Sequence, residues 1–161
     1  MRAFAVCLAC AFLVMPVSTI AASAAPSAAE SEAYLAANAK KDGVHVVPGI
    51  QYRVIKSGNG RQPGRWDCVT VAYRGTYTNG VEFDASPPGQ PRSFNVSGVI
   101  AGWSEALQMM HVGDKWELVV PPGLAYGKSG MPQAHIPGGQ TLVFTMELLK
   151  NWQTLSGDCS D

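Results

Sequence analysis

The sequence has little charge and no excess of either sign. Its 161 residues contain 12 basic and 12 acidic side chains, so the formal net charge is zero and charged residues make up only 15% of the chain. Proteins whose main partner is nucleic acid or an anionic membrane usually carry clustered Lys and Arg, and no such run occurs here. We therefore expect no nucleic-acid partner, and no membrane partner for the mature chain.

Residue patterns of metal, phosphate and covalent chemistry are also lacking. The histidines His45, His111 and His135 have neither the i, i+4 spacing nor the neighbouring carboxylates of a metal site. The stretch 123–129 is one residue shorter than a phosphate-binding loop, and Gly-Met-Pro follows it in place of a helix. No serine occupies a nucleophile elbow. We expect no metal, no cofactor and no covalent intermediate.

The sequence has a single long hydrophobic run, which lies at the N-terminus. Met1-Arg2 forms a minimal positive region, residues 3–17 are apolar and interrupted by Pro16, and Ala22-Ser23-Ala24 offers a small-residue cleavage site. The run is too short to span a bilayer comfortably. Residues 1–24 are therefore predicted to be a cleaved signal peptide, and the mature chain is expected to be exported, to a periplasm or the exterior.

Cysteine is scarce in the predicted mature chain, where only Cys68 and Cys159 remain. In an oxidising compartment the two can form a disulfide that ties the C-terminal tail, residues 151–161, to the strand carrying Cys68. The alternative is two unpaired thiols. The sequence leaves both open, because a bridge depends on a Cα separation that it does not supply.

Short alternating segments dominate the rest of the chain. Strands are predicted at 50–56, 66–77, 81–84, around 94–96, and at 115–120 and 141–149. Asn79-Gly80 predicts a two-residue hairpin turn with positive φ at both positions. Residues 25–48 are predicted to form a short helix and linker, with Ser27 and Glu30 at capping-box spacing and Gly43 at the end. Because no long dimerisation helix is visible, we expect a monomer.

Residues 99–110 are predicted to turn from a loop into one short helix. Trp103, Leu107 and Met110 recur at i, i+4 and i+7, so they share a helical face, and Gly113 closes the segment. A lone helix among strands is best explained as the plug of a curved sheet. The fold class is therefore predicted to be α+β, an antiparallel half-barrel sheet wrapped around one short central helix.

Aromatic residues from five separate elements are expected to face that helix. Aromatic side chains that point inward from a strand usually fill a core, and this is the ordinary interpretation of Tyr73 and Phe144 on the two long predicted strands. Asp84 favours a pocket instead, because a carboxylate among aromatics needs solvent or a partner. The five aromatics are Tyr73, Phe83, Trp103, Tyr126 and Phe144.

Five motifs in order resemble the FKBP-type peptidyl-prolyl cis-trans isomerases: residues 71–75, 80–84, 99–103, 124–127 and 141–144. Residues 36–43 and 49–55 are similar to the exported bacterial, Mip-like branch. The resemblance implies an FKBP-like fold, with residues 49–150 as the isomerase domain. It also implies that the chain accelerates X-Pro rotation in exported proteins, with proline-containing polypeptides as partners and macrolides as possible inhibitors.

The family pattern implies a role for each pocket residue. Trp103 would be the floor beneath the prolyl ring, Ile136 would cover the site, and Asp84 would lie beside the twisting amide. The Ile100 N–H and the Tyr126 hydroxyl would donate to substrate carbonyls. The catalytic group implied by the resemblance is Asp84, Tyr126, Ile100 and Phe83. The walls would be Tyr73, Phe83, Val99, Ile100 and Phe144.

Two positions depart from the family pattern. Met131 stands about where small members have a histidine, and Arg92 is the nearest equivalent of another pocket aromatic. Both residues belong to the expected pocket rim. They motivate an alternative function, an FKBP-like chaperone or binding module that holds proline-containing chains with little turnover.

Overall fold

The computed structural model describes residues 24–154 and 158–159, so the predicted signal peptide lies outside the described residues apart from Ala24. Within the described part of the chain, no helix is long and apolar enough to cross a membrane. The helical elements are α1 (Ala28–Asn38), η1 (Val96–Gly98), α2 (Ala101–Leu107), η2 (Pro122–Leu124) and η3 (Pro132–Ala134). The strands are β1 (His45–Val47), β2 (Ile50–Lys56), β3 (Cys68–Tyr77), β4 (Glu82–Ala85), β5 (Arg92–Asn95), β6 (Lys115–Val120) and β7 (Leu142–Trp152).

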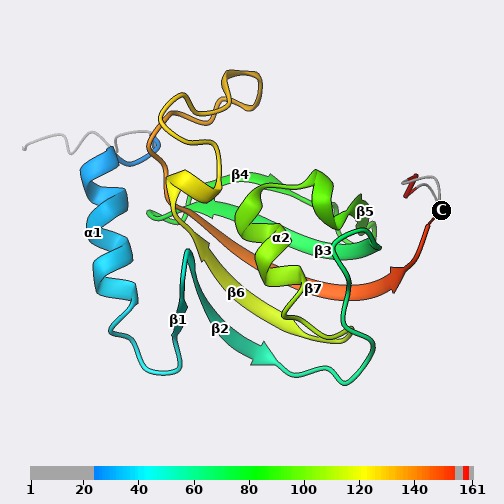
Figure 1. Ribbon diagram of the computed structural model, residues 1–161. Helices are drawn as coiled ribbons and strands as arrows, with labels where there is room; N and C mark the ends of the chain where they lie inside the picture. The colour runs from blue at the N-terminus through cyan, green and yellow to red at the C-terminus, as the bar shows by residue number, and fades with distance from the viewer. Residues whose placement is uncertain (1–23, 155–157, 160–161) are drawn as a thin grey trace, which may run out of the picture.

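The seven strands form one antiparallel sheet in the order β1-β2-β6-β7-β3-β4, and β5 also pairs with β3. Figure 1 shows this sheet curving around α2, while α1 stands at the side of the sheet where β1 lies. The predicted α+β half-barrel with a central helix is therefore confirmed.

Alternating side chains build the inner face of the sheet. The inward residues of β6 and β7 are at most 5% exposed and share one hydrophobic core with the inward residues of β3. Because side chains alternate along a strand, the period-2 pattern was sufficient to identify this face. The buried members in β6 and β7 are Trp116, Leu118, Val120, Leu142, Phe144, Met146 and Leu148.

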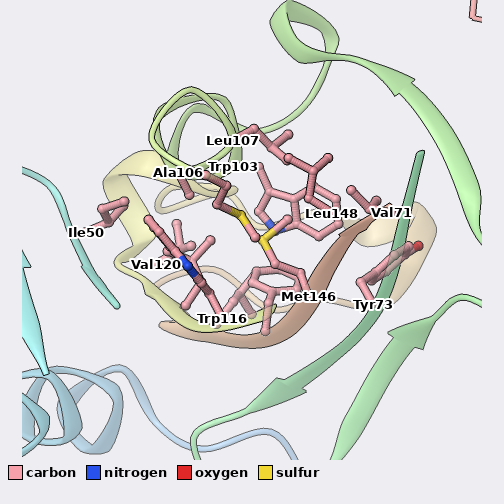
Figure 2. Packing of buried hydrophobic residues seen from close by; sticks show 14 of the residues in the cluster. Ile50, Val71, Tyr73, Trp103, Ala106, Leu107, Trp116, Val120, Met146 and Leu148 are labelled. Carbon is pink, nitrogen blue, oxygen red and sulfur yellow. The ribbon is translucent and has the colours of Figure 1, made fainter. Parts of the chain in front are cut away.

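The central helix is shorter than predicted but buries the predicted face. Trp103 and Leu107 of α2 and Met110, which follows the helix, are all buried. Figure 2 shows Trp103, Ala106 and Leu107 directed from α2 towards Met146 and Leu148 of the sheet.

Gly102 explains how close this helix lies to the sheet. A Cβ at this position would be 2.5 Å from Val120 Cγ1 and 3.3 Å from Ile50 Cγ2. The missing side chain faces β6 and β2, so the glycine permits helix–sheet contact.

The hairpin between β3 and β4 also differs from the prediction. Gly80 has a φ of +85°, but Asn79 does not share this left-handed conformation. Tyr77 N–H donates to the Val81 carbonyl at 2.8 Å, and Gly80 N–H donates to the Tyr77 carbonyl at 2.9 Å. The loop therefore has three residues, 78–80, with glycine in its last position, a common alternative to the two-residue turn.

The N-terminal helix packs through hydrogen bonds. Its predicted capping box between Ser27 and Glu30 is present, but the helix ends at Asn38, and Gly43 lies in the following turn. Buried Asn38 donates through Nδ2 to Gln51 Oε1 at 2.9 Å, and Gln51 Nε2 donates to the Leu35 carbonyl at 3.0 Å. These bonds join α1 to β2 although the helix has few large apolar residues.

A disulfide joins the tail to the sheet. Cys68 begins β3 and is fully buried, and it is bonded to Cys159 with a Cα separation of 5.5 Å, within the range for such bridges. The structure thus favours pairing over the two free thiols that the sequence left open.

Candidate active site

A cavity of about 300 Å³ opens between α2 and the concave face of the sheet. Its walls come from β3, β4, β5, α2 and β7, together with η1 and the loop after β6. Most of the lining side chains are aromatic or aliphatic, so the interior is apolar. The lining residues are Tyr73, Phe83, Asp84, Phe94, Gly98, Val99, Ile100, Trp103, Tyr126, Met131 and Phe144.

Trp103 is held at the centre of an aromatic cluster. Its ring meets those of Tyr73 at 5.0 Å, Phe144 at 5.2 Å and Phe94 at 5.9 Å between centroids. The interplanar angles of 82–89° are those of edge-to-face pairs, which aromatic quadrupoles favour. Because the side chain is only 5% exposed, the indole is a fixed surface.

Gly75 makes room for two of the wall residues. A Cβ at Gly75 would lie 2.7 Å from Phe83 Cζ and 2.9 Å from Phe144 Cε1. The two phenyl rings contact each other edge-on, with centroids 5.7 Å apart. The glycine in β3 therefore allows the aromatic walls to meet over the strand.

One side of the cavity mouth is polar. The Tyr73 hydroxyl donates to Asp84 Oδ2 at 2.6 Å, and Arg92 Nη1 donates to the Tyr73 hydroxyl at 3.1 Å. The same nitrogen lies 3.7 Å from Asp84 Oδ1. Burial raises the pKa of Tyr73, and its hydrogen bond to Asp84 raises that pKa further, so the phenol remains a donor at neutral pH.

Besides the indole Nε1 of Trp103, two hydrogen-bond donors at the cavity are unused, the Ile100 N–H and the Tyr126 hydroxyl. Among the hydrogen bonds of the described residues, none involves the Ile100 N–H or the Tyr126 hydroxyl. Ile100 is the N-cap of α2, a position whose N–H has no partner within the helix. Burial, and then the charge of Asp84, raise the pKa of Tyr126, so its hydroxyl also stays protonated. Both groups can therefore donate to a carbonyl entering the cavity.

The structure brings most of the predicted site residues together around the cavity, and Ile136 is not among the lining residues. Ile136 is 4% exposed and belongs to the same hydrophobic core as Trp103 and Phe144, which do line the cavity. Its N–H and carbonyl bond to Met131 in a short bridge, with Met131 N–H donating at 2.8 Å. This bridge ties Ile136 to Met131, and Met131 lines the cavity. The predicted residues that line the cavity are Tyr73, Phe83, Asp84, Val99, Ile100, Trp103, Tyr126 and Phe144.

Sequence reasoning did not assign Phe94 or Gly98 to the cavity. Phe94 pairs with Val69 and Arg92 pairs with Val71 in the β3–β5 ladder. Because residues i and i+2 share a face of a strand, Phe94 and Arg92 are directed to the same side. That alternation was visible in the sequence, but a four-residue strand does not reveal which side is inward.

The described residues provide no metal site. Within residues 24–154 and 158–159, no three His, Cys, Asp or Glu side chains are placed to hold a metal ion.

The sequence family described as FKBP-type peptidyl-prolyl cis-trans isomerase matches residues 59–149. The chain belongs to this family. It is 51% identical over 125 residues to the FKBP-type 22 kDa peptidyl-prolyl cis-trans isomerase of Escherichia coli K12, covering 76% of this chain and 60% of that protein. It is also 45% identical over 123 residues to the outer membrane protein MIP of Legionella longbeachae, covering 75% of this chain and 52% of that protein. These relatives place the chain in the bacterial Mip/FkpA branch of the family.

Solved structures of the family have the same fold. FkpA from Escherichia coli superposes with a TM-score of 0.73 at 44% identity, covering 78% of this chain and 59% of that chain. A peptidyl-prolyl cis-trans isomerase from Pseudomonas syringae gives a TM-score of 0.72 at 36% identity, covering 82% of this chain and 100% of that chain. The chain spans little more than half the length of the two curated relatives named above.

Proposed function

We propose that the chain is an FKBP-type prolyl isomerase that accelerates cis-trans rotation of X-Pro bonds in exported polypeptides. The observation that carries this proposal is the apolar cavity of about 300 Å³ with Trp103 at its centre and two unused donors at its wall. A prolyl ring is small and apolar, and the flanking peptide groups offer carbonyls to such donors.

The reaction suits a site without a nucleophile or a metal. Rotation about an X-Pro bond crosses a barrier of about 20 kcal/mol because amide resonance must be lost. An apolar slot that binds the twisted amide better than the planar one lowers that barrier. A thousandfold acceleration requires only about 4 kcal/mol of such differential binding.

Each residue has a part in this proposal. Trp103 would support the prolyl ring, with Tyr73, Phe83, Val99, Ile100 and Phe144 around it. The Ile100 N–H and the Tyr126 hydroxyl would donate to the carbonyls on either side of the proline. Asp84 would lie near the rotating amide, at the polar mouth. A macrolide inhibitor would bind in the same cavity and compete with the peptide.

The setting of the reaction also belongs to the proposal. The signal-like N-terminus and the relative named as an outer membrane protein support export of the mature chain. The disulfide between Cys68 and Cys159 supports an oxidising compartment, where such bonds persist. We take the working unit to be a monomer, to be checked by sedimentation of the mature chain.

An isomerisation assay with proline-containing peptides tests the proposal. The purified mature chain should accelerate cis-trans relaxation, and Asp84→Ala should lower kcat/KM at least tenfold. Glu82→Ala is the matched control, since Glu82 lies on the same strand and pairs with Arg74 at 2.7 Å, outside the cavity. Absence of acceleration by the wild-type chain would contradict the proposal.

The rim cation Arg92 supports a second function, that of a chaperone which binds proline-containing chains with little turnover. Suppression of client aggregation that survives Asp84→Ala while isomerisation is lost would favour that function.

A further inference from the structure

Arg92 contacts two residues that line the cavity, Tyr73 and Asp84, and most of its hydrogen-bonding capacity is unused. A guanidinium has five N–H donors on three nitrogens. Its Nη1 donates a hydrogen bond to the Tyr73 hydroxyl and faces Asp84. Among the described residues, Nε and Nη2 have no hydrogen-bond partner. The side chain is 47% exposed, so these donors are open to an incoming ligand.

Asp84 forms an ion pair with Arg92, and one of its carboxylate oxygens accepts a hydrogen bond. Oδ2 accepts the Tyr73 hydroxyl at 2.6 Å, and Oδ1 lies 3.7 Å from Arg92 Nη1. The charge of Arg92 already faces Asp84, while its Nε and Nη2 groups remain available to an acceptor or a carboxylate on a ligand.

The strand register holds the guanidinium in this place. Arg92 pairs with Val71 of β3, and Phe94, two residues later on the same face, lines the cavity. The guanidinium carbon lies 5.9 Å from the centroid of the Tyr73 ring, a cation–π distance. Its contacts with the ring and with the Tyr73 hydroxyl hold the side chain on the side of the cavity that carries Tyr73 and Asp84.

We propose that Arg92 is a specificity-determining residue that binds an acidic side chain next to the substrate proline. This inference rests on the proposed prolyl-peptide site. A carboxylate matches the free edge of the guanidinium and forms charge-assisted hydrogen bonds with it. A basic side chain in the same position is repelled by the Arg92 charge and has to compete with Arg92 for the Asp84 carboxylate. Acidic residues flanking proline should therefore be preferred over basic ones.

Two series of matched peptides test this, one varying the residue before proline among Glu, Gln and Lys and one varying the residue after it. Both kcat/KM and the calorimetric Kd are measured at low salt. In at least one series the wild-type protein should favour Glu over Lys about two- to fivefold, the range expected of an exposed ion pair. Arg92→Leu should bring that ratio close to one, Arg92→Glu should invert it, and high salt should reduce it in the wild type.

Arg74→Leu is the matched control. It removes the same charge from β3, but the ion pair of Arg74 is with Glu82, which does not line the cavity, whereas Arg92 contacts the lining residues Tyr73 and Asp84. Its ratio should equal that of the wild type. The inference would be overturned if the Glu-over-Lys ratio were the same in the wild type and Arg92→Leu in both series. It would also be overturned if Arg74→Leu changed that ratio as much as Arg92→Leu does. If the protein isomerises Gln-Pro peptides but shows no charge preference, the Arg92 inference fails and the isomerase proposal stands. If the protein has no isomerase activity, the ratio of the Kd values for the Glu and Lys peptides still tests Arg92.

Discussion

Tyr73 combines two tasks in the cavity. Its ring contacts Trp103 edge-on at 5.0 Å, and its hydroxyl links Arg92 and Asp84 at the mouth. One side chain thus couples the apolar floor to the polar rim. The hydroxyl can serve this role only while it carries its proton, which makes the Tyr73 pKa relevant to function.

The first prediction concerns pH. Burial and the bond to Asp84 raise the pKa of Tyr73 above its ordinary value of about 10, and burial raises that of Tyr126. Both phenols therefore stay protonated between pH 6 and 9, and no histidine lines the cavity. We expect kcat/KM to vary by less than about twofold across that range. A bell-shaped profile with a limb near pH 6.5 would contradict this expectation.

The same shift affects stability in a known direction. Because the folded state holds the Tyr73 proton more tightly than the unfolded state, the stabilisation is complete below pH 10 and is lost as pH rises above it. Urea unfolding should give a free energy that falls less steeply above pH 10 in Tyr73→Phe than in the wild type. Equal slopes in the two proteins would show that Tyr73 does not contribute.

At the scale of elements, the cavity depends on how closely α2 approaches the sheet. Gly102 allows this approach, because any Cβ there would meet Val120 and Ile50. Trp103 follows it directly, so the position of the indole depends on the position of the helix. Gly75 has a similar task in β3, where it allows Phe83 and Phe144 to meet.

Replacement of Gly102 tests this dependence. Gly102→Ala should destabilise the fold by about 1–3 kcal/mol, as overpacking of a close-packed core does. It should also lower kcat/KM, because a displaced helix moves Trp103 and the Ile100 N–H. Denaturant unfolding and the peptide assay measure the two effects.

Gly123→Ala is the control for that variant. A Cβ at Gly123 has no neighbour within 4 Å, and its φ lies outside the left-handed region. The control should change neither stability nor activity appreciably. A Gly102→Ala protein as stable as the control would show that the contact with Val120 is easily relieved.

Across the whole molecule, the disulfide joins the start of β3 to the tail over a sequence separation of 91 residues. Cys68 also faces Asn95 and Trp152 in the ladders of β5 and β7. The bridge therefore secures the sheet where three strands meet, on the strand that carries Tyr73 and Gly75. Closing so long a loop restricts the unfolded chain strongly.

Removal of the bridge should destabilise the mature chain. Cys159→Ser is the suitable variant, since Cys68 is fully buried and a serine there would add a buried hydroxyl. We expect a loss of about 2–4 kcal/mol in denaturant unfolding. Reduction of the wild type should produce the same loss, while the variant should not respond to reductant. Equal stability of oxidised and reduced wild type would contradict this prediction.

Local pattern was enough to predict most of the strands and the central helix. Alternation identified the inner faces of β6 and β7, and the spacing of Trp103, Leu107 and Met110 identified the buried face of the helix. These faces were accessible because side-chain direction follows the period of the backbone, which neighbouring residues along the chain reveal. The eight predicted residues that line the cavity lie in five motifs that resemble the FKBP-type isomerases, and that resemblance, rather than periodicity, grouped them in one pocket.

Tertiary contacts decided the remaining features. The bridge between Ile136 and Met131, and the position of Met131 at the cavity, depend on how the long loop after β6 folds back on itself. The contact of Gly102 with Val120, the pairing of Cys68 with Cys159 and the reach of Arg92 to Tyr73 all join positions at least 18 residues apart. Such contacts depend on how separate elements pack in three dimensions, which no local period encodes.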